Sequence, residues 1–249
     1  MIEVFISGVT GRVGRVLLDK IIKSESFSVS GGSASSNNVY IDLDLGNFNE
    51  TQSIGKKITT LIPSNLETDC IVDFSQPESS LNAVKFASEH NLPILIGTTG
   101  FTENQLQEIK VMANSCPLLL APNTSLGINL MKDMISKFGD GFKAFSLPVL
   151  QEKHHKDKKD SPSGTALYLA DQLNSMDLYK EDINIESERD GDTAGEHKIV
   201  FQREHESIEI IHNASNRSIF ADGAIEAIKW LVLKKPGLYS MDDIYSSSN

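Results

Sequence analysis

The chain of 249 residues is poor in cysteine and has no long apolar segment. Its two cysteines, Cys70 and Cys116, fall in or beside apolar, strand-like runs and lack metal-ligand spacing. This pattern excludes a cysteine-built metal site and favours two reduced core thiols, so we expect no bound metal. The longest apolar runs, at residues 92–96 and 117–121, are far too short to span a bilayer, and we expect no membrane partner.

Signals for export and for nucleic-acid binding are also missing. The stretch Met1–Ile6 runs directly into a strand-like pattern without the basic segment of a secretion signal, so we expect a cytoplasmic location. Lysine and arginine total 23 against 34 acidic residues, a net charge of −11. This surplus excludes general nucleic-acid binding, which needs a basic face. With 39% apolar and 23% charged residues, the chain is an ordinary folded protein of one large or two modest domains.

Residues 151–165 nevertheless form a positive island, with lysines at 156, 158 and 159. Taken alone, such a charged run is typical of a solvated loop. It ends in Ser-Pro-Ser-Gly-Thr ahead of an apolar stretch, which predicts a helix start with a Ser or Asp cap and Pro162 in the first turn. Lysines beside a helix N-terminus predict a site for a small carboxylate or phosphate. The preceding His154 and His155 add groups that exchange protons near neutral pH.

A second motif lies at the start of the chain. Residues 4–6 predict a strand, and apolar residues recur at helical spacing over residues 13–21. Gly8, Gly11 and Gly14 lie between and within these elements, spaced Gly-x-x-Gly-x-x-Gly. Strand, glycine loop and helix are the context of a dinucleotide-binding turn, although glycines close many other strand–helix turns.

The expected second strand, Phe27–Gly31, lacks the acidic residue that often binds adenosine ribose hydroxyls at this position. Residues 33–36 are Ser-Ala-Ser-Ser, and Arg12 belongs to the glycine loop. Small hydroxyl side chains and an arginine tolerate a 2′-phosphate, which favours NADPH, or the use of both NADPH and NADH.

Strands and helices alternate through the first half of the chain. Strands are expected at 70–74, 93–96 and 117–121, and Thr102 with Gln105 is expected to cap a helix. This alternation predicts an α/β fold with a Rossmann-type, doubly wound parallel sheet. Ligands bind such sheets at the carboxyl ends of the strands, here Gly8–Val13, Gly97–Thr99 and Ala121–Thr124. Residues 37–66 show no clear period.

The second half predicts a different architecture. We expect a helix over 126–138 that ends in a turn at 139–141, a strand over 144–150, a helix over 163–174, a polar and mobile segment over 175–197, and antiparallel strands at 198–202 and 207–212. A helix over 217–233 is expected to return to the first domain. The chain is thus divided into a dinucleotide-binding domain, 1–125 completed by 217–249, and an α+β domain, 126–216, with a mixed or antiparallel sheet.

The positive island also carries a resemblance. Its pattern Glu152-x-His154-His155-x-x-Lys158-x-Asp160-x-Pro162-Ser163-Gly164-Thr165-Ala166 resembles the signature of the dihydrodipicolinate (4-hydroxy-tetrahydrodipicolinate) reductase family of diaminopimelate and lysine synthesis. Further blocks agree in order, among them Asp73-Phe74-Ser75-x-Pro77-Glu78, Gly97-Thr98-Thr99-Gly100-Phe101, Ala121-x-Asn123-x-Ser125-x-Gly127-Ile128-Asn129, Gly195-Glu196-His197 and Ala221-x-Gly223-Ala224. The similarity runs from about residue 1 to residue 245.

The resemblance implies an oxidoreductase that reduces 4-hydroxy-tetrahydrodipicolinate to tetrahydrodipicolinate with NADPH or NADH. It implies a homotetramer built through the sheet of the second, substrate-binding domain. It makes His154 the acid/base residue and Lys158 the proton donor, with carboxylate contacts from His155, Ser163, Gly164 and Thr165. It implies cofactor contacts at Gly8, Val9, Thr10, Gly11, Arg12, Val13, Gly97, Thr98, Thr99, Ala121, Pro122, Asn123, Thr124, Arg217 and Phe220. A small dianionic substrate suits the positive island.

Two alternatives stand beside this interpretation. Another two-domain nicotinamide dehydrogenase would need a different catalytic constellation, and neither Cys70 nor Cys116 lies in a loop suited to a nucleophile. A non-catalytic dinucleotide sensor would keep the glycine loop but would have no need for His154, Lys158 and the Ser-Gly-Thr helix start together.

Overall fold

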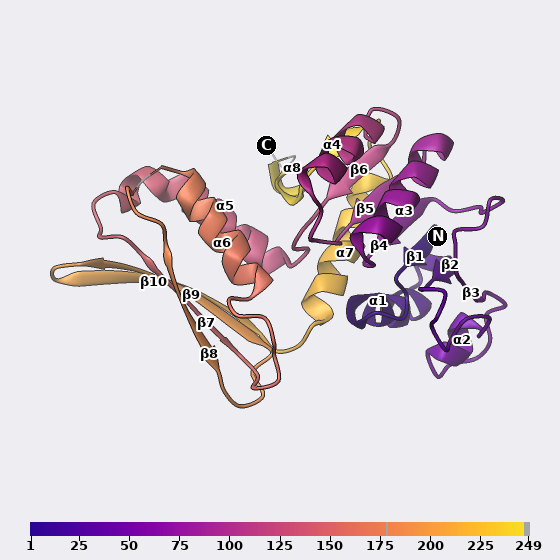
Figure 1. Ribbon diagram of the computed structural model, residues 1–249, viewed down its shortest axis with the longest axis horizontal. Helices are drawn as coiled ribbons and strands as arrows, with labels where there is room; N and C mark the ends of the chain where they lie inside the picture. Colours follow the sequence, from indigo (N-terminus) through magenta and orange to yellow (C-terminus); the bar gives the residue numbers. More distant parts are fainter. Residues whose placement is uncertain (178, 247–249) are drawn as a thin grey trace. The chain divides into compact units, whose positions relative to one another are not determined.

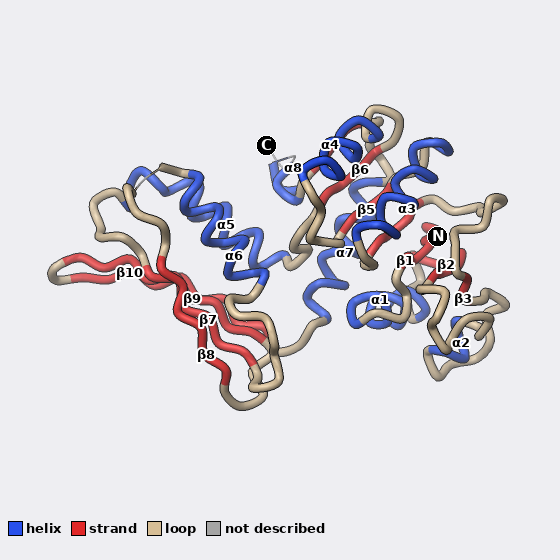
Figure 2. Tube along the Cα trace, in the orientation of Figure 1, coloured by secondary structure: helices blue, strands red, loops and turns tan. Residues whose placement is uncertain are grey.

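The computed structural model describes residues 1–177 and 179–246. The chain forms two compact units, each with its own sheet and helices (Figures 1 and 2). Unit 1 comprises Met1–Thr124 together with the segment that starts at Phe220, and unit 2 comprises Ser125–Ile219. No helix among the described residues is both long enough and apolar enough to cross a membrane.

Unit 1 is built on a parallel sheet with the strand order β11-β6-β5-β4-β1-β2-β3. Its strands are β1 (Ile2–Ser7), β2 (Phe27–Ser33), β3 (Ile58–Thr59), β4 (Cys70–Asp73), β5 (Ile94–Ile96), β6 (Pro117–Leu120) and β11 (Gly237–Tyr239). Its helices are α1 (Arg12–Ile22), α2 (Leu45–Phe48), α3 (Pro77–His90), α4 (Glu103–Met112), α8 (Met241–Ser246) and α7 (Ser218–Leu231) from Phe220 onward. The doubly wound parallel sheet predicted from the alternating elements is confirmed.

Apolar side chains cover both faces of this sheet. Val4 and Ile6 of β1 point to one face, where they belong to a buried cluster with residues of α1 and α7. Phe5 points to the other face and belongs to a cluster with residues of α3 and α4. Successive side chains of a strand point to opposite faces, so a strand buried on both sides reads as an unbroken apolar run.

The strand order reverses between β1 and β4, which is the switch point where doubly wound sheets bind ligands. Ser7 of β1 is in register with Asp73 of β4, Asp73 with Ile96 of β5, and Ile96 with Leu120 of β6. The three loops that follow these strands, and that are expected to contact the cofactor, therefore start at one edge of the sheet.

Unit 2 has a sheet with the strand order β10-β9-β7-β8, in which β7 pairs with β8 in parallel and the other pairs are antiparallel. Its strands are β7 (Val149–His154), β8 (Asn184–Arg189), β9 (Gly195–Arg203) and β10 (Glu206–Ala214). Helices α5 (Leu126–Phe142) and α6 (Gly164–Ser175) cover one face through a shared apolar cluster (Figure 1). This confirms the predicted mixed sheet of an α+β unit.

Several local predictions are wrong. Helix α5 does not end at residue 138 but continues through Gly139, which is buried in its packed face, to Phe142. Residues 144–148 are not a strand. The polar segment expected to be mobile contains β8, an edge strand whose side chains are mostly exposed while its backbone pairs with β7. In each case, tertiary packing or strand pairing outweighed local propensity.

Two further differences concern loops and caps. Residues 37–66, which show no period, contain the short elements α2 and β3. Helix α6 is capped by the Ser163 hydroxyl, and Pro162 precedes this cap rather than occupying the first turn. The capping box of Thr102 and Gln105 at α4 is confirmed.

Replacement of Gly14 by alanine is expected to destabilise the protein. A Cβ at Gly14 would lie 2.3 Å from the carbonyl oxygen of Gly8, so helix α1 would have to move away from the turn. Overpacking of this kind costs about 1–3 kcal/mol, which urea unfolding would detect as a lower midpoint. The control is Gly141→Ala in α5, where nothing lies within 4 Å of the new Cβ and alanine should add roughly 0.5–1 kcal/mol of stability. Equal midpoints for the two variants would contradict a close approach of α1 to the glycine turn.

Candidate active site

The turn after β1 has the geometry of a phosphate-binding loop. Gly8 has a φ of +78°, and a Cβ there would lie 2.4 Å from the carbonyl oxygen of Phe74. Gly11 is the N-cap residue of α1, and no side chain among the described residues caps this helix. The backbone N–H groups in the first turn of α1 thus have no side-chain cap. A helix N-terminus of this kind, approached closely by glycine backbone, fits a dinucleotide pyrophosphate.

The other expected cofactor residues of the first loop surround this turn. Val9 is buried and Thr10 accepts a hydrogen bond from Asn38, whereas Arg12 is exposed at the first position of α1. Val13 follows Arg12 in the first turn of the helix. The loop therefore offers its backbone and one cationic side chain rather than its apolar side chains.

Threonine side chains at the other strand ends have partners inside unit 1. The Thr98 hydroxyl donates to the Asp73 carboxylate and accepts from the Ser75 amide, and the Thr124 hydroxyl donates to the carbonyl oxygen of Phe220 at 2.7 Å. Gly97 leaves room for the Phe74 ring, since a Cβ there would lie 2.0 Å from a ring carbon. The remaining expected residues differ in exposure: Thr99 and Pro122 are exposed, and Ala121 and Asn123 are buried.

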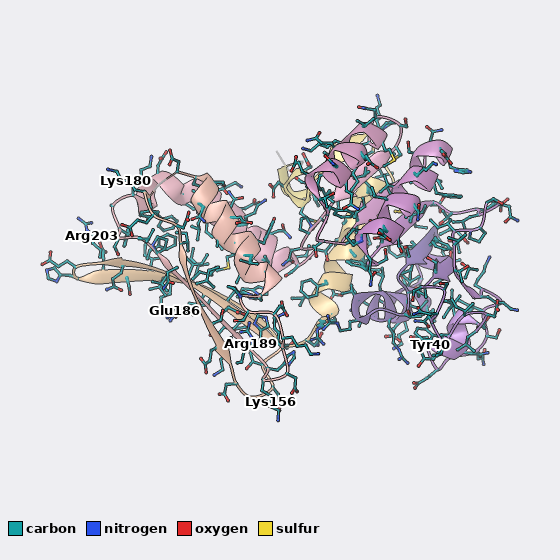
Figure 3. All side chains as sticks on the ribbon, viewed as in Figure 1. Tyr40, Lys156, Lys180, Glu186, Arg189 and Arg203 are labelled. Carbon is teal, nitrogen blue, oxygen red and sulfur yellow. The ribbon has the colours of Figure 1, made fainter. Side chains whose placement is uncertain are left out.

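In unit 2, the register of the sheet gathers polar groups at the carboxyl end of β7. Glu152 and His154 share the face of β7 that α5 and α6 cover. On β9, His197 is directly opposite Glu152, and on β8, Arg189 is opposite His154. Figure 3 shows Arg189 and Lys156 at this end of the sheet, far from Arg203 at the tip of the β9–β10 hairpin.

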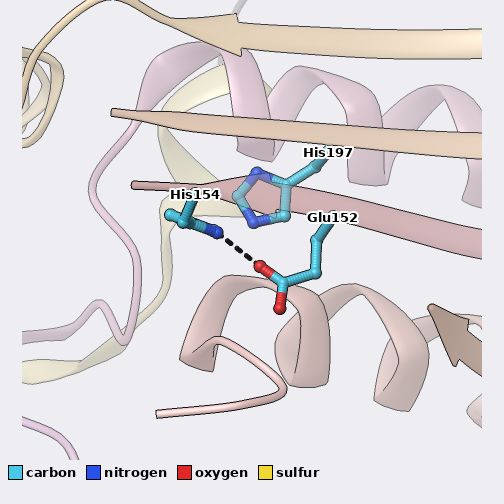
Figure 4. A group of neighbouring side chains, drawn as sticks. All are labelled: Glu152, His154 and His197. Carbon is cyan, nitrogen blue, oxygen red and sulfur yellow. Dashed lines mark ion pairs between the residues drawn. The ribbon is translucent and has the colours of Figure 1, made fainter. Parts of the chain in front are cut away.

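Glu152 is the centre of these contacts. Its side chain is 0% exposed, and its Oε1 accepts from Arg189 Nη2 at 2.7 Å and from the Ser163 amide at 3.2 Å. Its Oε2 lies against His154 Nδ1, the contact drawn as a dashed line in Figure 4. Burial opposes ionisation, but hydrogen bonds from Arg189 and Ser187 outweigh burial and hold the pKa of the Glu152 carboxyl below its ordinary value.

His154, the expected acid/base residue, is almost fully buried. Burial is the largest influence and lowers the pKa of His154 below its ordinary value, while the Glu152 carboxylate works in the opposite direction. The Nε2 edge of the ring faces Gly195, where a Cβ would lie 3.0 Å from Nε2. Glycine at this position therefore avoids a side-chain clash with the nitrogen that Glu152 does not contact.

His197 lies next to both Glu152 and His154 in Figure 4, and its ring centroid is 5.2 Å from that of His154. Its Nε2 is 3.1 Å from the Ser163 hydroxyl, which also accepts the Ala166 amide as the cap of α6. Burial lowers the pKa of His197 to about 3, so the ring is neutral. Ser163, expected to bind substrate, thus uses its hydroxyl to join the start of α6 to β9.

Lys158, the expected proton donor, is paired with Asp160. Its Nζ is 2.8 Å from both carboxylate oxygens of Asp160. Burial raises the pKa of Asp160, but hydrogen bonds from Lys158 and from the amides of Asp160 and Gly164 outweigh it, and the pKa lies below its ordinary value. A carboxylate of the chain itself therefore occupies Lys158, the expected proton donor, and the Gly164 amide, an expected substrate contact. Thr165 follows in the first turn of α6.

His155 and Arg217 lie together in unit 2. The Arg217 guanidinium is 3.3 Å from His155 Nε2, and the His155 amide donates to the Thr193 carbonyl at 2.7 Å. The resemblance implies a cofactor contact for Arg217 and a substrate contact for His155. Within unit 2, the structure brings Arg217 to His155, which is one of the candidates for carboxylate binding.

Glu152, His154 and His197 also present potential ligand atoms for a metal ion, all within 4.8 Å of one another. The donor set does not suit a cation. The Arg189 guanidinium already neutralises the Glu152 carboxylate, and His154 Nδ1 is directed at that carboxylate. These contacts favour a shared proton over a metal ion.

The sequence alone assigns no role to Glu152, Asp160, Arg189 or His197. Glu152 and Asp160 belong to the island motif, so their carboxylates are a visible signal beside His154 and Lys158. Nothing in the sequence marks Arg189 as a site residue, because it lies in a polar stretch far from the island. Only the pairing of β8 with β7 in the folded sheet brings it there.

These features define the class: a nicotinamide-type dinucleotide unit joined to a unit with a buried histidine and a group of lysine and arginine side chains. Two family models match the chain, "Dihydrodipicolinate reductase, N-terminus" over residues 2–124 and "Dihydrodipicolinate reductase, C-terminus" over residues 127–245. The chain belongs to the dihydrodipicolinate reductase family.

Similar proteins agree with this family. The 4-hydroxy-tetrahydrodipicolinate reductases of Syntrophotalea carbinolica and Methanoregula boonei are 37% and 32% identical, each over 98% of both chains. A solved structure of dihydrodipicolinate reductase from Paenisporosarcina sp. TG-14, with dipicolinate bound, has a TM-score of 0.78 at 23% identity. It covers 96% of this chain and 97% of its own, and it supports the fold.

The buried His197 is expected to make the protein acid-sensitive. The unfolded chain protonates this residue near its ordinary pKa of 6.5, whereas burial lowers its folded pKa to about 3. Between these values the unfolded state binds more protons, so the free energy of unfolding falls as the pH falls, approaching about 1.4 kcal/mol per pH unit. Urea unfolding at pH 6.5, 5.5 and 4.5 should show a shallower loss for His197→Asn than for the unaltered protein. Parallel losses would contradict a neutral buried His197.

Proposed function

We propose that this chain reduces 4-hydroxy-tetrahydrodipicolinate to tetrahydrodipicolinate with NADPH or NADH, in the synthesis of diaminopimelate and lysine. The observation that carries the proposal is the combination of buried His154, cationic Lys158 and the N-terminus of α6 in one unit of a family member. The dipicolinate bound to the Paenisporosarcina enzyme is a ring dicarboxylate and supports a dicarboxylate ligand here.

The two units divide the work in this proposal. Unit 1 binds the dinucleotide through the uncapped start of α1 and the adjoining strand ends, and unit 2 binds the substrate. The bound reduced nicotinamide supplies a hydride. The substrate loses its hydroxyl together with a hydrogen of the neighbouring carbon as water, and one hydride and one proton add to the unsaturated ring. The chain must therefore bind a dianion, deliver a proton and stabilise the negative charge that hydride addition builds in the ring.

Lys158 and His154 carry the proton chemistry. The Lys158 ammonium supplies a proton and a positive charge beside the substrate. His154 exchanges a proton at Nε2, because its Nδ1 is directed at Glu152. Burial keeps the resting imidazole neutral, so it accepts a proton before it donates one.

Cations and helix amides hold the substrate carboxylates. Arg217 and the lysines of the island give this end of unit 2 its positive charge, and His155 lies beside Arg217. The Gly164 and Thr165 amides lie in the first turn of α6, which carries partial positive charge. Ser163 contributes by capping the helix and so holding these amides in place.

Substrate binding displaces the carboxylate of Asp160 in this scheme. Asp160 accepts from Lys158 and the Gly164 amide, which are two of the proposed substrate donors. The Asp160 side chain is 59% exposed, and exposed ion pairs contribute only about 0–1 kcal/mol. The substrate carboxylate therefore replaces Asp160 at small cost.

A cytoplasmic location and a homotetramer belong to the same proposal. The reduced cysteines and the biosynthetic role support the location. The open edge strand β10, with exposed Ile208 and Ile211, supports assembly through the sheet of unit 2.

Turnover is expected to depend on Lys158. We would follow nicotinamide absorbance with freshly generated 4-hydroxy-tetrahydrodipicolinate and either NADPH or NADH. Lys158→Ala should lower kcat by roughly a hundredfold or more, because it removes both a proton donor and a stabilising charge. Lys180→Ala, which removes the same charge from an exposed position of unit 2, should behave like the unaltered protein. Absence of substrate-dependent oxidation by the unaltered protein would overturn the proposed function, and near-normal kcat in folded Lys158→Ala would remove Lys158 from the mechanism.

Loss of the Asp160 carboxylate is expected to tighten dicarboxylate binding. Isothermal titration with dipicolinate should give a Kd roughly 3–10-fold lower for Asp160→Asn, since one to two weak contacts no longer compete with the ligand. Asp157→Asn makes the same charge change in the same loop but leaves the Lys158–Asp160 pair intact, so it measures the general electrostatic effect. Equal gains in both variants would mean that Asp160 does not compete for the site.

A further inference from the structure

Glu152 is a buried charge that neither binds nor protonates the substrate in the proposed function. Its contacts are with Arg189, His154 and the Ser163 amide rather than with the proposed substrate donors, and its side chain is fully enclosed. A buried carboxylate is costly unless its lone pairs are occupied by donors. Arg189 and the Ser163 amide donate to Oε1, whereas Oε2 faces His154. This difference between the two oxygens indicates the role of Glu152.

The two oxygens of Glu152 have different partners. Oε1 accepts from Arg189 Nη2 and the Ser163 amide, at 2.7 and 3.2 Å. Oε2 lies against His154 Nδ1, and Ser187 is a further donor to the carboxylate. The histidine ring is the group that Oε2 faces in Figure 4.

This contact determines the histidine tautomer. An ionised carboxylate can only accept hydrogen bonds, so His154 must carry its proton on Nδ1. Nε2 is then the nitrogen with a lone pair, and Gly195 places no side chain against it. Arg189 contributes by stabilising the ionised form of Glu152, which keeps the acceptor available.

We propose that Glu152 is a positioning residue that holds His154 in the Nδ1–H tautomer, so that Nε2 exchanges the proton of the reaction. The inference rests on the proposed function for the role of Nε2, but the tautomer itself does not depend on turnover. Arg189, through its hydrogen bond to Oε1, keeps the carboxylate ionised and oriented.

Four groups act on His154 from the elements packed around it. Glu152 of β7 favours the protonated ring, whereas Lys158 of the island and Arg189 of β8 disfavour it. His197 of β9 is neutral and faces the ring edge-on. Removal of the Glu152 charge leaves burial and two cations acting together, so the pKa of His154 falls further.

Glu152→Gln should reverse the tautomer. Arg189 and the Ser163 amide both donate to the position of Oε1, so the glutamine carbonyl must occupy that position. The glutamine NH2 then faces His154 Nδ1 as a donor, and Nδ1 must become an acceptor, with the proton on Nε2. A wrong tautomer of this kind removes the lone pair that exchanges the proton.

The test is long-range 1H–15N correlation NMR of the full-length protein labelled at histidine. The chain has six histidines, and the His154 signals are assigned by their loss in His154→Gln. The unaltered protein should show a protonated Nδ1 and an unprotonated Nε2, and Glu152→Gln the reverse. Glu152→Asp, which keeps the acceptor, should retain the original pattern. An unprotonated Nδ1 in the unaltered protein would overturn the proposal even if no variant folds.

Activity gives the second readout. In Glu152→Gln, kcat should fall by roughly a hundredfold or more at little change in KM, and the limb of the kcat–pH profile that reports His154 should move to lower pH. Glu188→Gln is the matched control, since exposed Glu188 lies on β8 and pairs with half-buried Lys153 instead. An unmoved limb and unchanged kcat in Glu152→Gln would overturn the role in catalysis. Absence of turnover in the unaltered protein would instead overturn the proposed function and leave the tautomer result standing.

Discussion

The carboxylate of Glu152 is fully buried, and a charge in this environment must be compensated by donors with good geometry. Arg189, the Ser163 amide and His154 provide that compensation, and they come from β8, from the start of α6 and from β7 itself. The strand register and the helix start must therefore both be correct before the charge is satisfied. The cap of α6 depends on the same arrangement, because the Ser163 residue that donates to Glu152 also accepts the Ala166 amide and contacts His197.

Unit 2 consequently has an inner and an outer layer at this end of the sheet. The inner layer, Glu152, His154 and His197, is buried, and in the proposed scheme it sets the tautomer of His154. The outer layer contains Lys158 paired with Asp160 and His155 beside Arg217, and these exposed contacts are weak enough to be exchanged for those of an anion. A fixed proton site beneath an exchangeable charge site suits a reductase that must bind a dianion and then protonate it. Unit 1 differs from unit 2, because its glycine turn and the start of α1 present backbone N–H groups rather than charged side chains to an anion.

Much of the fold could be predicted because the buried strands of unit 1 are apolar runs in the sequence. These runs are separated by segments in which apolar residues recur at helical spacing. The predictions failed where local sequence and tertiary context disagree. The glycines of α5 predict a turn, yet Gly139 packs into the buried face of a continuous helix. The sequence of β8 predicts a mobile segment, because the side chains of this exposed edge strand do not alternate between polar and apolar. The segment forms a strand because its backbone pairs with β7. The candidate site was visible in the island motif only for residues close together in the chain.

The sequence by itself determined the two-part architecture, the glycine turn and the grouping of His154, Lys158 and the helix start, because each depends on residues within one local segment. Tertiary structure alone decided which groups act on those residues. Arg189 and His197 reach Glu152 because β8 and β9 flank β7 in one register, and a shift by one residue would turn their side chains to the other face. Arg217, 62 positions from His155 in the chain, reaches it only through the fold of unit 2. Proton positions and charge compensation are properties of distances in space, and those distances are set by packing.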